Sequence, residues 1–245
     1  MRTARIPRGI RSLPRKESLS ERIYYDLRER LQRGAIGPEE RLVDKDLAAA
    51  YQTSRMPARE ALLRLVNDGY LTGTTRGFAV PTLSPEQVGD LFEVRRLLEP
   101  YAAADAAKHL DAAALAQLAD ALHQARAAVR ANNGEEMILA NMAFRNAWLG
   151  CVSNRSLAEN IARFVDHVQT VRLSTLSNPA TRKVDMDGLE GLYEALVKRD
   201  SAKVRTRMAA FLAAAERAFF AARAAELAAA FAAAAPARPR LRKVR

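Results

Sequence analysis

The chain contains 245 residues, and its hydrophobic share of 49% is sufficient for folded cores, so the composition argues against a disordered protein. The formal net charge of +11 arises at the two ends. Residues 1–16 carry six basic side chains, residues 236–245 carry five, and neither segment contains an acid, so residues 17–235 are neutral overall. We expect both tails to be disordered, either simply solvated or adding non-specific attraction to phosphate.

Cysteine content and hydropathy restrict the class of protein further. Cys151 is the only cysteine, which excludes an internal disulfide and a thiolate metal cluster and favours a reduced cytoplasm. No run of about 18 apolar residues lacks a charge, because the nearest candidate is interrupted by Glu216, Arg217, Arg223 and Glu226. The basic N-terminus lacks the apolar centre of a secretory signal. We therefore expect a cytoplasmic protein that does not cross a membrane.

Residues 17–83 predict three helices followed by a β-hairpin. Apolar periodicity predicts helices over residues 20–33, 44–51 and 54–68. The capping residues expected at their N-termini are Ser20, Asp44 and Ser54. Gly69 ends the third helix. Two short extended pieces are predicted at residues 70–72 and 78–81. Residues 73–77 between them form a tip that is bounded by glycines. This order of elements is that of a winged helix-turn-helix.

Residues 84–235 predict an all-helical second domain, so the expected fold class is mainly α. A helix start is expected at Ser84, and no strand signal follows residue 83. Loops are predicted near residues 110–111, 132–134, 153–154, 177–179 and 198–200. The last helix is long and alanine-rich and reaches about residue 235. Short loops between successive helices indicate an antiparallel bundle.

The third helix of the first domain carries the strongest signal for function. Arg55 and Arg59 are four residues apart and share one face, while Leu62 and Leu65 belong to the opposite side. A helix fits the major groove of DNA, where arginine binds O6 and N7 of guanine with two hydrogen bonds. The helix N-terminus at Ser54 favours phosphate. We therefore predict that this helix reads bases.

Three further residues of the first domain are predicted to contact DNA. Lys45, at the start of the second helix, can reach the groove edge or the backbone. Arg76 at the hairpin tip suits a minor-groove or phosphate contact, and Gly77 beside it permits close approach. Residues 17–83 hold equal numbers of basic and acidic residues, so binding depends on one-sided placement of charge. The alternative is that the arginines are merely solvated, which the surrounding pattern of elements disfavours.

Five short runs between residues 42 and 99 form a specific pattern. They read LVDKDL (42–47), SRMPAREALLRL (54–65), DGYL (68–71), RGFAV (76–80) and VRRLLE (94–99). This pattern resembles the GntR superfamily of transcriptional regulators, in its FadR-like branch. The resemblance implies that Lys45, Arg55 and Arg59 contact bases or nearby phosphates and that Gly77 lies at the minor groove. It also implies that a two-fold dimer binds a short palindrome. Pro38-Glu39 departs from the family's usual Pro-Gly, which affects the loop before the second helix.

Residues 84–235 resemble the C-terminal domain of the FadR-like branch, a helical ligand-binding bundle. That resemblance implies a divalent metal site with one Asp and three His, whose positions here hold Asn141, Arg145, Leu189 and Phe211. Asparagine is a weak ligand, leucine and phenylalanine have no donor atom, and arginine repels a cation. The three histidines of the chain have no ligand spacing among themselves. We therefore predict no metal and no cofactor.

Arg145 offers a positive charge that can take the place of the metal as the anchor of an anionic effector. Its guanidinium suits a carboxylate or a phosphate, which it can bind through two hydrogen bonds. Asn141 lies one turn earlier and can share the same ligand. Arg95 and Arg172 match basic positions that line or close the pocket.

Three other interpretations of these residues remain open. Arg145 can instead pair with an internal acid, such as Asp185, Asp187 or Glu190. Arg95 has Glu99 four residues later on the same helix, which favours an intrahelical ion pair. Leu189 and Phe211 can also close an apolar pocket that takes a greasy ligand or none.

These patterns together predict a dimeric transcriptional regulator, a repressor of metabolic genes, that binds double-stranded DNA at a palindromic operator and responds to a small-molecule effector. A second hypothesis is a ligand-independent DNA-binding regulator whose C-terminal domain only dimerises. An enzyme is disfavoured because the chain offers no nucleophile–base pair, carboxylate dyad, phosphate loop or metal set.

Overall fold

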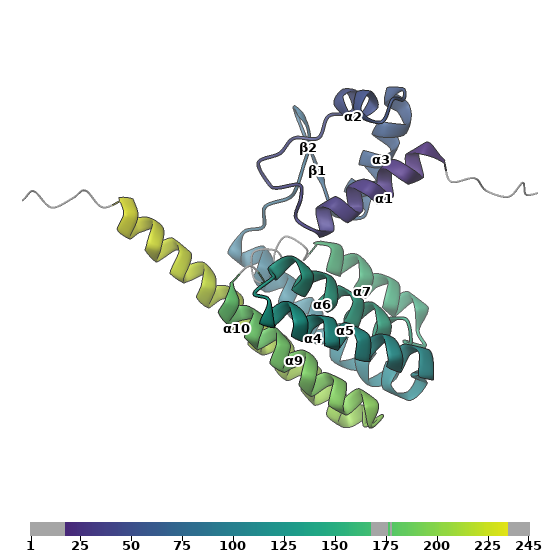
Figure 1. Cartoon of the computed structure of the whole chain (residues 1–245), viewed down its shortest axis with the longest axis vertical. Helices are drawn as coiled ribbons and strands as arrows, with labels where there is room; N and C mark the ends of the chain where they lie inside the picture. Colours follow the sequence, from purple (N-terminus) through teal and green to yellow (C-terminus); the bar gives the residue numbers. More distant parts are fainter. Residues whose placement is uncertain (1–17, 168–175, 177, 235–245) are drawn as a thin grey trace, which may run out of the picture.

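The computed structural model describes residues 18–167, 176 and 178–234, so the predictions for the two tails lie outside the described residues. The N-terminal part, here called the head, contains α1 (Leu19–Gln32), α2 (Asp44–Ala50), α3 (Arg55–Asn67), β1 (Thr72–Thr74) and β2 (Gly77–Ala79). The remainder, here called the bundle, contains α4 (Pro85–His109), α5 (Ala112–Arg130), α6 (Gly134–Leu149), α7 (Arg155–His167), α9 (Pro179–Val197) and α10 (Ser201–Ala234). Figure 1 shows the head above the bundle. The mainly α fold predicted from the sequence is confirmed.

The helix N-termini of the head differ from the prediction at two places. The cap of α1 is Ser18 and not Ser20, because Ser18 and Glu21 form a reciprocal capping box. In it the Glu21 N–H donates to Ser18 Oγ (3.2 Å), and the Ser18 N–H donates to the Glu21 carboxylate (2.8 Å). Asp44 is the first residue of α2 and does not cap it, since its carboxylate binds arginine side chains instead. Ser54 precedes α3 as predicted.

The β-hairpin is antiparallel, and its strands lie closer to the tip than predicted, so that Gly73, Thr74 and Gly77 of the predicted tip belong to strands. Thr72 pairs with Ala79, and the two strands meet again at the pair Thr74 and Gly77. Tyr70 and Leu71, expected at the start of the first strand, are buried in the head core. The chain therefore uses these two apolar side chains for packing and begins to pair only after them.

The head has a hydrophobic core of its own between its three helices. The buried side chains include Ile23 and Leu27 of α1, together with Leu62 and Leu65 of α3. Each such side chain contributes about 1.5–3 kcal/mol when it is removed from water. The hairpin is joined to this core by a bridge to Leu42, two residues before α2, in which the backbones of Leu42 and Phe78 exchange two hydrogen bonds of 2.8 Å. The packing presents the polar face of α3 to solvent.

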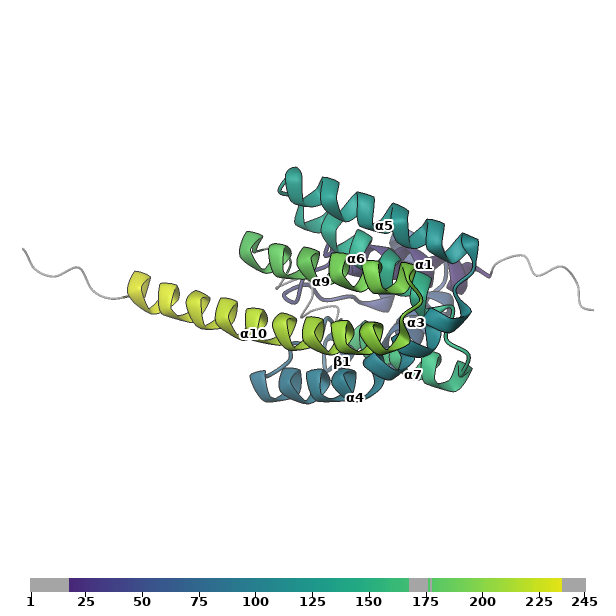
Figure 2. The ribbon, with the colours of Figure 1, turned by 90° about the horizontal axis from the view of Figure 1, so that it is seen from below.

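The bundle is built from helices that start where capping residues predict. Ser84 and Gln87 form a capping box at the start of α4. Asp111 and Asn133 cap α5 and α6, and Asn178 caps α9 with a bond to the Ala180 N–H. The turns predicted between these helices near residues 110–111, 132–134, 153–154 and 198–200 are therefore confirmed. Figure 2 shows α10 running beside α4 and α9, in agreement with their packing.

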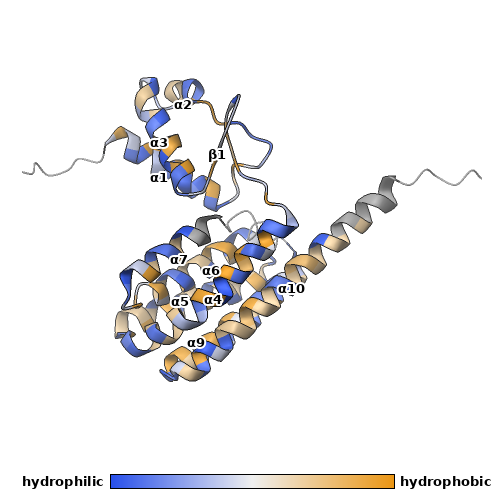
Figure 3. Cartoon of the chain, turned by 180° about the vertical axis from the view of Figure 1, so that it is seen from behind, coloured by the Kyte–Doolittle hydropathy of each residue, from blue (hydrophilic) through white to orange (hydrophobic). Residues whose placement is uncertain are grey.

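The last helix extends beyond the rest of the bundle. Phe219 of α10 packs on Val88 and Phe92 of α4, which forms a small apolar cluster separate from the main core. Beyond this cluster α10 continues past its neighbours, as its yellow end shows in Figure 1. Figure 3 shows apolar residues gathered along the helices of the bundle. Over the residues that the structure describes, none of the helices combines the length and the apolar character that a membrane span requires.

Candidate DNA-binding surface and ligand pocket

The polar face of α3 carries the two arginines that the sequence singled out. Ala58 and Ala61 of α3 are buried against the head core, which fixes the rotation of the helix. The side chains of Arg55 and Arg59 lie on the other face and are 66% and 58% exposed. Two guanidinium groups therefore project from the first two turns of a short helix whose opposite side is anchored.

Both arginines contact a single carboxylate that sequence reasoning did not assign to the site. Arg55 Nη2 donates to Asp44 Oδ1 at 3.0 Å and to Oδ2 at 3.1 Å. Arg59 Nη1 lies 3.7 Å from Asp44 Oδ2. The only hint in the sequence was the position of Asp44 beside Lys45 at the start of α2, where an acid is ordinarily explained as a helix cap.

Lys45, Ser54 and Arg76, which are also predicted to contact DNA, are exposed as well. Lys45 follows Asp44 in the first turn of α2, and Ser54 precedes α3 without making a side-chain capping hydrogen bond. Arg76 lies at the tip of the hairpin, where its N–H donates to Thr74 Oγ1 at 3.3 Å. Their side chains thus lie at the N-termini of α2 and α3 and at the tip of the β1–β2 hairpin, which is the wing of the winged helix-turn-helix.

Gly77 has a structural role in addition to the predicted approach to DNA. Its φ is +122°, a conformation that side chains disfavour. A Cβ atom built at this position would lie 2.6 Å from the carbonyl oxygen of Leu42. The hairpin therefore needs a glycine here in order to pair with Leu42.

Polar contacts also join α1 to α3 and to the residue that follows α3. Tyr24 donates to Asp68 Oδ2 at 2.7 Å, and the guanidinium of Arg64 lies 3.9 Å from the centre of the Tyr24 ring. Burial, followed by the hydrogen bond to Asp68, raises the pKa of Tyr24 to about 12. The phenol is therefore a neutral donor at physiological pH, and it ties α1 to the C-terminal end of α3.

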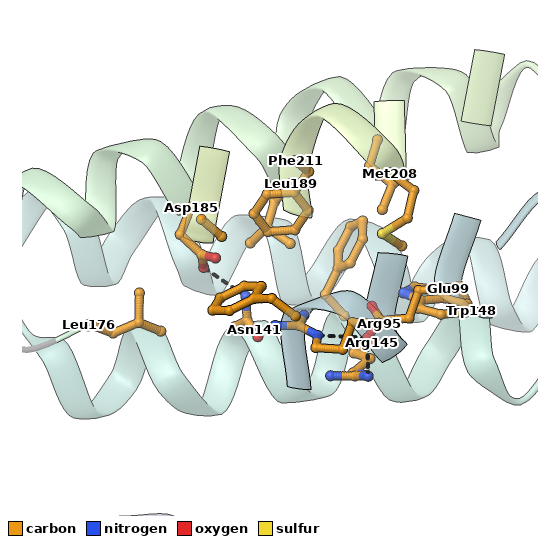
Figure 4. A pocket seen from close by; sticks show the side chains of 14 residues that line it. Arg95, Glu99, Asn141, Arg145, Trp148, Leu176, Asp185, Leu189, Met208 and Phe211 are labelled. Atoms are coloured by element: carbon orange, nitrogen blue, oxygen red, sulfur yellow. Dashed lines mark hydrogen bonds and ion pairs between the residues drawn. The ribbon is translucent and has the colours of Figure 1, made fainter. Parts of the chain in front are cut away.

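A pocket inside the bundle collects five of the six residues predicted to bind an effector. Arg95 of α4, Asn141 and Arg145 of α6, Leu189 of α9 and Phe211 of α10 all line it. Its free volume is about 60 Å³, which is room for several water molecules or for a compact ligand. Figure 4 shows these side chains converging from four helices. The sixth residue, Arg172, lies outside the described residues.

The charged groups of the pocket are organised around a buried glutamate. Arg95 Nε and Arg145 Nη2 both donate to Glu99 Oε1, each at 2.7 Å. The interpretation of Arg95 and Glu99 as an intrahelical pair is therefore confirmed. Arg145 does meet an internal acid, Glu99 of α4, which was not among the acids named from the sequence, because α6 also packs against α4. One carboxylate oxygen thus holds two arginines (Figure 4).

A second polar pair occupies another part of the pocket. Asn141 Nδ2 donates to Asp185 Oδ2 at 2.7 Å, which joins α6 to α9. The ring of Phe211 packs so closely on Gly188 that a Cβ atom there would lie 2.1 Å from its Cδ2 atom. Leu189 is fully buried beside it. The contact between α9 and α10 is therefore apolar and tightly packed, while α4 and α6 supply most of the polar groups of the pocket.

The donor set of this pocket does not fit a divalent metal. Asn141 directs its amide nitrogen at Asp185, and Arg145 brings a cation to the position of a ligand. Across the described parts of the chain, no three histidine, cysteine or acidic side chains gather in a way that would hold an ion. Nitrogen donors that carry protons do not coordinate a cation, so no metal chemistry is assigned to the site.

A winged helix-turn-helix joined to a helical domain with an internal pocket is the architecture of a DNA-binding transcriptional regulator with a sensor domain. The model for "Bacterial regulatory proteins, gntR family" matches residues 19–79, and the model for the FCD domain matches residues 90–214. The chain belongs to the GntR family of transcriptional regulators and carries an FCD domain. The resemblance noted in the sequence is therefore confirmed, as is the assignment to regulators and not to enzymes.

Three comparisons show how far this likeness extends. The HTH-type transcriptional regulator McbR of Escherichia coli K12 is 35% identical over 131 residues, which are 53% of this chain and 59% of McbR, less than two thirds of its length. The HTH-type transcriptional repressor RspR of the same strain is 27% identical over 198 residues, covering 78% of this chain and 85% of RspR. The solved structure of E. coli McbR/YncC has a TM-score of 0.74 at 28% identity and covers 84% of this chain and 98% of that one.

Proposed function

We propose that the protein binds a palindromic operator as a homodimer in the cytoplasm and represses metabolic genes. The observation that carries this proposal is the pair of exposed guanidiniums of Arg55 and Arg59 on one face of α3, whose opposite face is anchored in the head. Two such helices related by a two-fold axis would read two half-sites about one helical turn apart. The name of RspR as a repressor supports the direction of regulation.

The other residues predicted to contact DNA are proposed to position the head on the duplex. Lys45 and Ser54 lie at helix N-termini, where backbone N–H groups and a positive side chain favour phosphate. Arg76 and Gly77 at the wing are proposed to reach the minor groove or its phosphates. These contacts would set orientation and affinity, whereas Arg55 and Arg59 would set base preference.

Selection from a pool of randomised duplexes tests this proposal and identifies the operator in the same experiment. We expect the wild-type chain to enrich a palindrome that contains guanines. Arg55→Ala and Arg59→Ala should each weaken binding to that sequence by about 1–3 kcal/mol and relax the base preference. Arg33→Ala is the matched control, because Arg33 contacts Glu135 and therefore faces the bundle. Enrichment of no sequence by the wild type would refute the proposal.

We further propose that the pocket binds a small, anionic effector without a metal. The guanidiniums of Arg95 and Arg145 meet at one carboxylate oxygen, so a carboxylate or phosphate of a ligand would find two positive charges side by side. Asn141 would contact the same ligand, Leu189 and Phe211 would pack on its apolar part, and Arg172 remains a predicted contributor. The effector would act by favouring one arrangement of the two heads over another.

Thermal unfolding in the presence of small organic acids and sugar acids tests the effector. A ligand at 100 times its Kd stabilises a protein by about 2.7 kcal/mol, which raises the melting temperature measurably. Arg145→Gln should abolish that shift, whereas Arg126→Gln, which removes a charge outside the pocket, should keep it. Treatment with a chelator should change neither melting curve.

A second function is favoured by one specific observation. Glu99 already binds both pocket arginines, so its negative charge already offsets part of their positive charge without a ligand. If no acid in the panel shifts the melting curve, the chain is better described as a ligand-independent regulator whose bundle only dimerises.

A further inference from the structure

The contact between Asp44 and the two arginines is unusual for a surface that meets DNA. Asp44 is the first residue of α2, and its side chain is only 8% exposed although its partners are largely exposed. Both of its oxygens accept from Arg55 Nη2, and Oδ2 also faces Arg59. The carboxylate is therefore largely shielded from solvent, while both guanidiniums remain exposed.

An acid at this place weakens the attraction between the head and any duplex. DNA phosphates repel a carboxylate, and non-specific affinity depends almost entirely on charge. Because Asp44 lowers the affinity for DNA in this way, we expect it to have a second, favourable effect through the two arginines. Both hydrogen bonds from Arg55 to the carboxylate use the same nitrogen, Nη2, so the carboxylate does not occupy the donors on Nε and Nη1. Such bonds restrict the rotamers of a long side chain before it meets a base.

We propose that Asp44 is a positioning residue for base reading, which holds Arg55 and Arg59 in the orientation that distinguishes guanine and lowers affinity for duplexes without the operator. This inference rests on the proposed function of the two arginines. It assigns to one carboxylate two effects of opposite sign, a gain at the operator and a loss on other DNA. Sequence preference would arise from the difference between them.

The protonation state of Asp44 supports this role. Burial alone would raise the pKa of the carboxyl group, but the hydrogen bonds and charge of Arg55 outweigh it and lower the pKa below its usual value. The group is therefore ionised at physiological pH. A charged carboxylate forms stronger hydrogen bonds to guanidinium than a neutral group does.

The test compares Asp44→Asn with Asp46→Asn on two duplexes, the sequence that the wild type selects and a scrambled sequence of equal length. Asp46 lies in the same turn of α2 and is exposed, so its variant removes the same charge without disturbing the contacts of Arg55 and Arg59 with Asp44. For Asp44→Asn we expect operator affinity to fall by about tenfold or more, while affinity for scrambled DNA stays equal or rises. For Asp46→Asn both affinities should rise together.

Two further variants test whether the position of the Asp44 carboxylate, and not only its charge, controls the affinity for the operator. Asp44→Glu keeps the charge but displaces the carboxylate, so operator affinity should fall while scrambled affinity stays low. In the Arg55→Ala background, Asp44→Asn should change the ratio of the two affinities much less than in the wild type, because the arginine that is hydrogen-bonded to Asp44 is gone and only Arg59 remains nearby. Melting curves verify that each variant is folded.

The outcomes distinguish this inference from the function on which it rests. Equal losses on both duplexes, or an unchanged ratio of affinities in Asp44→Asn, would overturn the positioning role and leave DNA reading by the arginines intact. If the wild-type chain selects no sequence at all, the proposed function itself is wrong.

Discussion

At the scale of single residues, close contacts limit which side chains the head accepts. Gly77 is the clearest case, because the space of a Cβ atom is already occupied by the carbonyl oxygen of Leu42. Gly73 lies in the same hairpin, yet a Cβ atom there would meet nothing within 4 Å. The two glycines of one small hairpin therefore differ in what they contribute, and they form a natural pair for comparison.

We expect Gly77→Ala to destabilise the head by about 1–3 kcal/mol, since it adds strain at a positive φ to a clash with the backbone of Leu42. Gly73→Ala should change stability by less than about 0.5 kcal/mol. Urea unfolding followed by circular dichroism measures both. Equal effects of the two substitutions would show that the hairpin is not held against Leu42.

Tyr24 gives the head a dependence on alkaline pH. Its pKa is raised to about 12, above the value of about 10 in an unfolded chain, first by burial and then by the hydrogen bond to Asp68. A group whose pKa is higher in the fold contributes stability that is complete below about pH 10 and is lost as the pH rises through about 12. We expect the free energy of unfolding to fall between these pH values, and to fall less in Tyr24→Phe. Parallel pH profiles for the two proteins would contradict this assignment.

At the scale of elements, the contact between α9 and α10 defines one wall of the pocket. Gly188 and Gly191 lie about one turn apart on α9. A Cβ atom at Gly188 would overlap the Phe211 ring, whereas one at Gly191 would make ordinary contacts of 3.6 Å or more with the flexible side chain of Arg207. Close approach of the helices thus depends on the first glycine and not on the second.

We expect Gly188→Ala to lower stability by about 1–3 kcal/mol, because Phe211 must move away from α9. Gly191→Ala should be neutral or stabilising by up to about 1 kcal/mol, since alanine favours a helix. Thermal unfolding of the two variants measures the difference. If both substitutions stabilise the protein, the Phe211 ring can move away from α9 without a loss of stability.

At the scale of the whole molecule, head and bundle have separate cores and a modest contact. Arg33, the residue that follows α1, lies 3.5 Å from Glu135 of α6, and both side chains are about half exposed, so this ion pair contributes at most about 1 kcal/mol. The same helix α6 carries Asn141 and Arg145 in the pocket. Helix α6 therefore connects the pocket to the head, but only through this weak ion pair.

The two basic tails belong to the same scale, because they hold the whole net charge of the chain. We expect replacement of the five basic residues in 236–245 by serine to reduce the dependence of DNA affinity on salt, by about 0.9 in the logarithmic slope for each phosphate that the tail no longer neutralises. The preferred sequence should not change. Binding measured from about 50 to 200 mM salt tests this, and an unchanged slope would show that this tail does not bind DNA.

The sequence alone determined the order of elements in the head, the helical nature of the bundle and the face shared by Arg55 and Arg59. These features depend on local periodicity, capping residues and turns, all of which act over a few positions. The positions of Asn141, Arg145, Leu189 and Phe211 around one pocket also followed, because the resemblance to a known family supplied their alignment.

The tertiary structure decided which charges meet. Asp44 reaches Arg55 across 11 residues, Glu99 reaches Arg145 across 46, and Asn141 reaches Asp185 across 44. The bond from Arg145 to Glu99 was missed because several acids lie at suitable positions in the sequence, and only the packing of α6 against α4 brings this one to the guanidinium. Helix periodicity fixes the face on which a side chain lies, but the rotation of neighbouring helices fixes its partner, and that rotation is set by the packing of the whole core.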